Sequence, residues 1–61
     1  MNEIEARFIR KDENVYMFKQ YGLDNKQIII KKLYDFFRSE FENVSVDFDF
    51  NYGGRYIVKA V

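Results

Sequence analysis

Only one stretch of the chain has the period of a helix, and strand-like segments flank it in pairs. Over residues 25–41 apolar side chains recur every three or four positions, which is the spacing of one face of an α-helix. Residues 3–10, 15–21, 44–51 and 55–61 instead alternate in polarity or are rich in β-branched and aromatic residues, as strands are. The chain is therefore restricted to an α+β fold in which one helix packs against several strands.

The helical segment carries one broad apolar stripe, which suits a helix lying across a sheet. Its members are Ile29, Ile30, Leu33, Tyr34, Phe36, Phe37 and Phe41. Asp24 and Gln27 have the spacing of a capping box, so we expect the helix to begin at Asn25. We expect it to fray near Glu42 and Asn43, because Asn tolerates the left-handed conformation that ends helices.

The first two strands are expected to form a hairpin with a four-residue loop over residues 11–14. Successive side chains of a strand point to opposite faces of the sheet, so alternation assigns an inward set toward the core and an outward set away from it. The inward set is Ile4, Ala6, Phe8, Tyr16 and Phe18, and the outward set is Glu3, Glu5, Arg7, Val15, Met17 and Lys19.

The last two strands are expected to form a second hairpin, with a turn at residues 51–54 whose two glycines supply positive φ angles. The inward set is Val44, Val46, Phe48, Phe50, Tyr56, Val58 and Ala60. The outward set is Ser45, Asp47, Asp49, Asn51, Ile57, Lys59 and Val61. Because the final strand is apolar on both faces apart from Arg55 and Lys59, it is expected at the centre of the sheet or at a dimer contact.

These elements predict one small α+β domain over residues 1–61. Its order is ββαββ, with a four-stranded, mainly antiparallel sheet in strand order 1-2-4-3 and one helix packed on one face. The chain supplies no second helix for the other face. That uncovered face is therefore where we expect function to lie.

Composition removes several classes of function. The chain has no Cys and no His, so a disulfide, a structural zinc site, a thiolate nucleophile and an imidazole base are all excluded. Neither a calcium-type loop nor another regular ligand spacing is present. We therefore expect no catalytic residues, no metal and no cofactor.

Charge is balanced overall, with ten Lys and Arg against ten Asp and Glu, but it is segregated along the chain. The outward carboxylates of the third strand, continued by Glu3 and Glu5, are expected to form an acidic stripe that binds a partner. The partner-binding candidates are Asp47, Asp49, Tyr52, Arg55, Ile57 and Lys59. The alternative is a basic outer helix face that contacts nucleic-acid phosphates through Lys26, Lys31, Lys32 and Arg38.

The sequence thus favours a non-enzymatic protein-interaction module. Phe, Tyr, Met, Ile, Asn and Lys make up 31 of the 61 residues, and their codons are AT-rich. We therefore expect a phage- or mobile-element-encoded inhibitor or regulator of a host protein, such as a defence nuclease. The alternatives are a nucleic-acid-binding regulator acting as a dimer and a plain homodimer. With no apolar run of membrane-spanning length and no signal peptide, a cytoplasmic location without membrane contact is expected.

Overall fold

The computed structural model describes residues 4–61, apart from the side chain of Tyr52. Glu3 and its expected outward position lie outside this range. The elements are β1 (Ala6–Asp12), β2 (Val15–Gln20), α1 (Lys26–Arg38), β3 (Val44–Asp49), the 3-10 turn η1 (Asn51–Gly53) and β4 (Arg55–Ala60).

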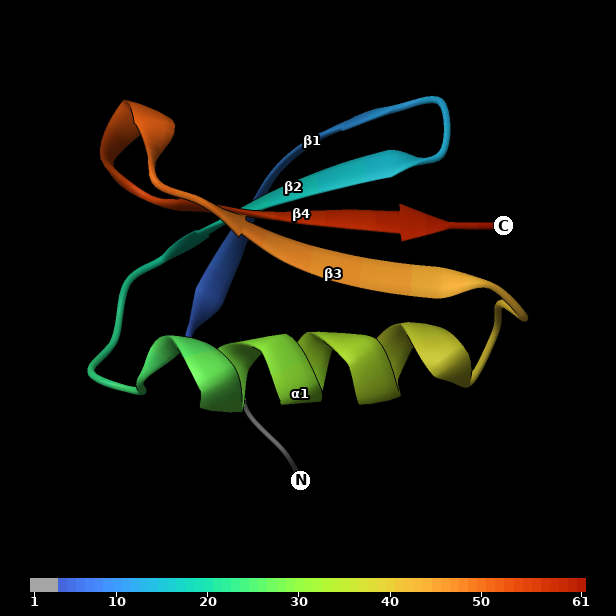
Figure 1. Cartoon of the computed structure of the whole chain (residues 1–61), viewed down its shortest axis with the longest axis horizontal. Coiled ribbons are helices and arrows are strands. Elements are labelled where there is room, and N and C mark those ends of the chain that lie inside the picture. Colours follow the sequence, from blue (N-terminus) through green and yellow to red (C-terminus); the bar gives the residue numbers. More distant parts are fainter. Residues whose placement is uncertain (1–3) are drawn as a thin grey trace.

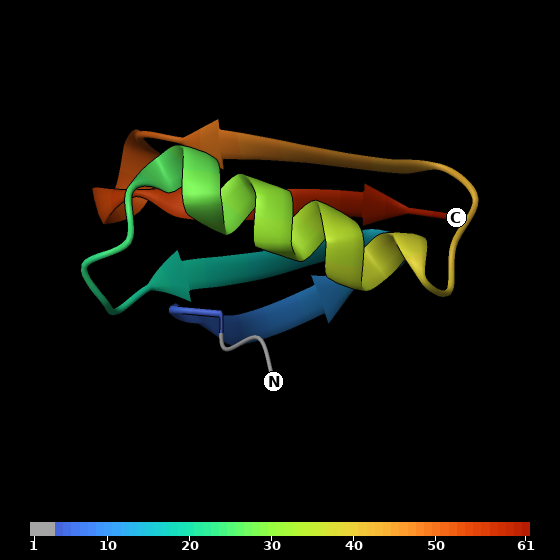
Figure 2. The same cartoon turned by 90° about the horizontal axis from the view of Figure 1, so that it is seen from below.

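The strands form one antiparallel sheet in the order β1-β2-β4-β3, and α1 crosses one of its faces (Figures 1 and 2). The ββαββ fold and the expected strand order are confirmed. The apolar last strand, β4, lies between β2 and β3 because only a central strand can bury side chains over most of its length.

The core forms where α1 meets β4. Ile29, Leu33 and Phe37 are spaced by four residues on one side of α1, and each is at most 5% exposed. They pack with Tyr56, Val58 and Ala60, which β4 presents toward the helix. Tyr16 and Phe18 of β2 pack against the same cluster, as the alternation predicts.

The first hairpin is tighter than expected. Its turn contains only Glu13 and Asn14, and β1 runs on to Asp12. Glu13 adopts a positive φ of 56°. The expected four-residue loop is wrong because the polar residues Lys11 and Asp12 belong to an edge strand, which is exposed to water. A β-bulge at Ile9 accommodates the extra length.

The start of α1 is one residue later than the capping-box spacing predicts. Asn25 is the N-cap, and its Oδ1 accepts a hydrogen bond from the Ile28 amide at 3.0 Å. Asp24 instead forms an ion pair with Lys32, with 3.1 Å between Nζ and Oδ2. The predicted reciprocal pairing of Asp24 with Gln27 is therefore wrong.

The end of α1 is earlier than expected. The helix ends at Arg38, and the C-cap Ser39 keeps a right-handed conformation. The Ser39 hydroxyl donates to the Phe36 carbonyl at 2.7 Å. Phe41 then turns back so that its ring stacks 6.1 Å from that of Phe37. The expected fraying near residues 42 and 43 is wrong because this return to the core stops the helix first.

The turn between β3 and β4 depends on its glycines, as expected. Gly53 and Gly54 have φ angles of 79° and 91°, which residues with a Cβ rarely adopt. The Asp49 side chain accepts a hydrogen bond from the Asn51 amide at 3.0 Å and fixes the start of the turn. Phe50, expected to point inward, is 77% exposed because it follows the last residue of β3.

Within residues 4–61, α1 is too short and too polar to cross a lipid bilayer, and no other α-helix is present.

Candidate binding surface

The face of the sheet opposite α1 is covered by no other element of residues 4–61 (Figure 1). We call it the open face. Strand alternation and the register of the ladders define its members. They are Arg7, Ile9, Arg10, Asp12, Val15, Met17, Lys19, Ser45, Asp47, Asp49, Arg55, Ile57 and Lys59.

The ladder register arranges most of these side chains in three rows that cross all four strands. In the order β1, β2, β4, β3, the first row is Arg7, Lys19, Arg55 and Asp49. The second row is Arg10, Met17, Ile57 and Asp47. The third row is Asp12, Val15, Lys59 and Ser45.

The middle of the open face is apolar. Met17 and Ile57 lie directly opposite each other on β2 and β4, and both are half-buried. Charged side chains surround them in the first row and at both ends of the second. An apolar centre within a charged rim is the usual anatomy of a protein-binding surface.

The two edge strands carry opposite net charge on the open face. β1 contributes Arg7, Arg10 and Asp12 at one edge, whereas β3 contributes Asp47 and Asp49 at the opposite edge. The face as a whole carries five cationic side chains and three carboxylates. These are Arg7, Arg10, Lys19, Arg55 and Lys59 against Asp12, Asp47 and Asp49.

The expected continuation of the acidic stripe onto the first strand is wrong. β1 and β3 are the two edges of the sheet, so their carboxylates cannot adjoin. The Glu5 carboxylate instead accepts hydrogen bonds from the Leu23 and Asp24 amides at 3.1 and 2.9 Å, and so holds the β2–α1 loop. Glu3 lies outside the described residues.

Five of the six partner-binding candidates meet on the open face of β3 and β4. Asp47, Asp49, Arg55, Ile57 and Lys59 occupy adjacent positions there. The sixth candidate, Tyr52, belongs to η1 at the end of the same hairpin, and its side chain lies outside the described part.

Sequence reasoning missed the basic end of the open face. The register places Arg7, Lys19 and Arg55 side by side in the first row. Beside them lies a cavity of about 320 Å³ lined by Arg7, Lys19, Gln20 and Tyr21. The Arg7 guanidinium lies 5.7 Å from the centre of the Tyr21 ring. Only the strand order combined with the register could have revealed this cluster, because its members are far apart in sequence.

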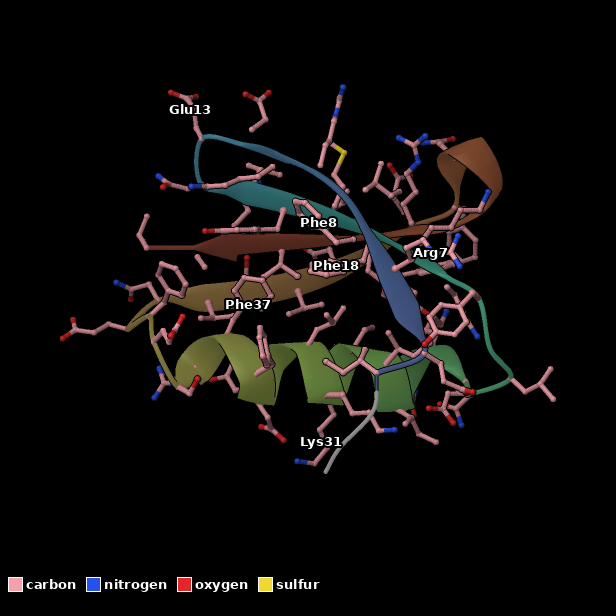
Figure 3. All side chains as sticks on the ribbon, turned by 180° about the vertical axis from the view of Figure 1, so that it is seen from behind. Arg7, Phe8, Glu13, Phe18, Lys31 and Phe37 are labelled. Carbon is pink, nitrogen blue, oxygen red and sulfur yellow. The ribbon has the colours of Figure 1, made fainter. Side chains whose placement is uncertain are left out.

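The basic helix residues do not converge on one ligand site. Lys31 points away from the sheet (Figure 3) and pairs with Asp35 at 3.0 Å. Lys32 pairs with Asp24. The Lys26 ammonium lies 5.2 Å from the Phe48 ring centre.

Arg38, the last of the four, donates to the Glu42 carbonyl at 2.6 Å. All four candidates therefore have intramolecular contacts that compete with phosphates.

A second apolar surface lies between β1 and α1. Phe8, Phe18 and Phe37 converge there (Figure 3), with 5.6 Å between the ring centres of Phe8 and Phe18. Phe8 and Phe36 were expected to be inward, yet they are 53% and 62% exposed. The reason is that α1 lies closest to β3 and β4 and leaves the β1 side partly uncovered.

Two observations on the described residues concern metal binding and ionisation. No group of three or more carboxylates within residues 4–61 is arranged to hold a metal ion. Burial raises the pKa of the Tyr56 hydroxyl, but this group lies inside the core and donates to Gln20 Oε1 at 2.8 Å.

Comparison of the chain with protein-family models, with curated proteins and with solved structures finds no match. The inference of function therefore rests on the open face itself.

Proposed function

We propose that the protein is a non-catalytic module that binds another protein through its open face. The observation that carries this proposal is the half-buried pair Met17 and Ile57 at the centre of a face rimmed by charges of both signs. An apolar centre supplies most of the binding free energy, and a charged rim steers encounter and selects the partner.

A non-catalytic role is supported by the residues the chain contains. With no His and no Cys in the sequence, general acid–base or nucleophilic catalysis would depend on Lys, Tyr, Ser or carboxylates. The lysines of α1, Lys26, Lys31 and Lys32, engage an aromatic ring or a carboxylate, and Tyr56 is buried in the core.

The proposal keeps a host protein, such as a defence nuclease, as the target of inhibition or regulation, with the cytoplasm as the place of action. This part rests on the AT-rich composition of the chain. Composition bears on the origin of the protein and not on the geometry of the open face.

Two matched variants test the proposal. Ile57→Lys puts a charge at the centre of the open face, whereas Ile28→Lys makes the same change on α1, where Ile28 is 41% exposed. A tagged protein would capture partners from cells of the source organism. Each variant would then be titrated against the purified partner, with circular dichroism to verify folding.

We expect Ile57→Lys to weaken binding by at least about tenfold, as loss of a central anchor does, and Ile28→Lys to bind like the wild type. Equal affinities of the wild type and both variants for the partner would contradict the proposal.

A second candidate function is nucleic-acid binding, and the first row of the open face favours it. Arg7, Lys19 and Arg55 are adjacent there. In this candidate function the phosphates therefore contact the sheet, and not the basic helix residues that the sequence predicts. This candidate requires binding of DNA or RNA that weakens steeply with salt and is reduced by Lys19→Glu. Failure to shift either nucleic acid at low salt and micromolar protein would eliminate it.

A further inference from the structure

The charges of the open face are arranged so that the face is complementary to itself. Arg7 on β1 and Asp49 on β3 are the two ends of the first row. Arg10 and Asp47 are the two ends of the second row, with Met17 and Ile57 between them. Each of these two rows thus runs from a cation at one edge of the sheet to a carboxylate at the other.

Two copies can meet face to face about a two-fold axis parallel to the strands. Such a rotation places β1 of one copy over β3 of the other and β2 over β4, and it keeps every row opposite itself. Arg7 then faces Asp49 of the second copy, and Arg10 faces its Asp47. Met17 of each copy faces Ile57 of the other. Because the axis is two-fold, each of these contacts occurs twice.

The other face-to-face two-fold arrangement has its axis perpendicular to the strands. It would place β3 over β3 and β1 over β1, so that Asp47 meets Asp47 and Arg10 meets Arg10. Facing like charges oppose association. The charge pattern therefore selects the axis parallel to the strands.

Side-chain lengths fit the same arrangement. Packed sheets lie about 10 Å apart, a gap that a long Arg and a short Asp side chain span together at the edges. Met17 and Ile57 fill the middle. Two contacts are unfavourable, because Lys19 of each copy faces Arg55 of the other.

We propose that the open face binds a second copy of the chain in this orientation. The inference rests on the proposed function, because it names the partner of the same face.

Strands of six residues at about 3.4 Å per residue and 4.8 Å spacing give a footprint of roughly 400 Å² per copy. A standard interface buries about 800 Å² per partner. We therefore expect a weak dimer that dissociates between millimolar and micromolar concentration.

Charge reversal at Arg10 and Asp47 tests the orientation, because both side chains are exposed. Arg10→Asp leaves two carboxylates at the ends of the second row, and Asp47→Arg leaves two cations. Each variant alone would bring like charges together at both edges of the dimer. We expect each to dimerise at least about tenfold more weakly than the wild type.

The decisive step is to mix the two variants. In a mixed dimer the carboxylate introduced at position 10 of one copy would face the guanidinium introduced at position 47 of the other. At the opposite edge the unchanged Arg10 would face the unchanged Asp47, so a one-to-one dimer of near wild-type affinity is expected. Sedimentation equilibrium measures each affinity. The double variant R10D/D47R should also dimerise by itself, which keeps the test valid if one single variant folds poorly.

The matched control is Lys31→Asp, a reversal of the same kind on the outer side of α1, which should leave dimerisation unchanged. A wild type that stays monomeric at millimolar concentration would overturn the inference. Single variants that dimerise like the wild type, or a mixture no tighter than its components, would do so as well.

This inference and the proposed function can fail separately. If the wild type is monomeric but Ile57→Lys abolishes binding of a captured protein, the open face binds a different partner and only the second copy is ruled out. If the mixed dimer forms and no other protein depends on Ile57, the second copy is the partner.

Discussion

Tyr56 connects the core to the β2–α1 loop through its hydrogen bond with Gln20. Its side chain is fully buried, and its hydroxyl donates to Gln20 Oε1 at 2.8 Å. The Gln20 amide group in turn donates to the carbonyls of Gly22 and Asp24 in the β2–α1 loop. Strand alternation predicts that Tyr56 is inward, but not its bond to Gln20, because the two residues lie 36 positions apart.

The raised pKa of Tyr56 predicts a loss of stability in alkali. The fold favours the neutral hydroxyl, so its contribution to the free energy of unfolding is complete below the pKa of an unfolded tyrosine, about 10. The contribution then declines as pH rises through the higher pKa of the folded state.

Tyr56→Phe should lower stability at neutral pH by about 1–2 kcal/mol through the lost hydrogen bond, and should reduce the further loss above pH ~10. Urea unfolding measures both effects. Tyr34→Phe, at an exposed site on α1, is the control for general alkaline effects. An alkaline loss of the same size in Tyr56→Phe as in the control would refute this role.

At the scale of the elements, periodicity identifies each segment, whereas local side-chain bonds decide where it ends. The helical spacing correctly predicts that Ile29, Leu33 and Phe37 are buried. The helix start was missed by one residue because Asp24 and Asn25 are both good caps, and only the path of the chain selects between them. The bulge at Ile9 was missed because alternation carries no signal of an inserted residue.

Replacing the N-cap tests this account of the helix start. Asn25→Ala should lower the free energy of unfolding by about 1 kcal/mol, because the Ile28 amide loses its partner. Asn25→Asp should stay within a few tenths of the wild type, since it keeps the cap oxygen. Thermal or urea unfolding would measure both variants, and equal losses would show that Asn25 is not the cap.

At the scale of the whole molecule, the number of elements predicts the open face, but their register decides its chemistry. One helix cannot cover both faces of a four-stranded sheet, so the uncovered side follows from the sequence. The outward parity of Asp47, Asp49, Ile57 and Lys59 follows from alternation. The exposure of Phe8 and Phe36 was not predicted. Periodicity assigns a side chain to one face of its strand or helix, but it does not say how far the helix and the sheet overlap.

The charge difference between the two edges of the open face could be predicted only in part. The predicted strand order already places the first and third strands at the edges, but nothing in the sequence indicates the bulge that sets Arg10 opposite Met17. Self-complementarity is consequently a property of the assembled sheet and of no single segment.

Methyl NMR spectra recorded from micromolar to millimolar concentration test most directly whether the open face binds a second copy of the chain. The account predicts that the signals of Met17 and Ile57 shift together with concentration, while that of Ile28 on α1 stays fixed. Movement of Ile28 with Met17 and Ile57 unchanged, or no movement of any signal over that range, would contradict it.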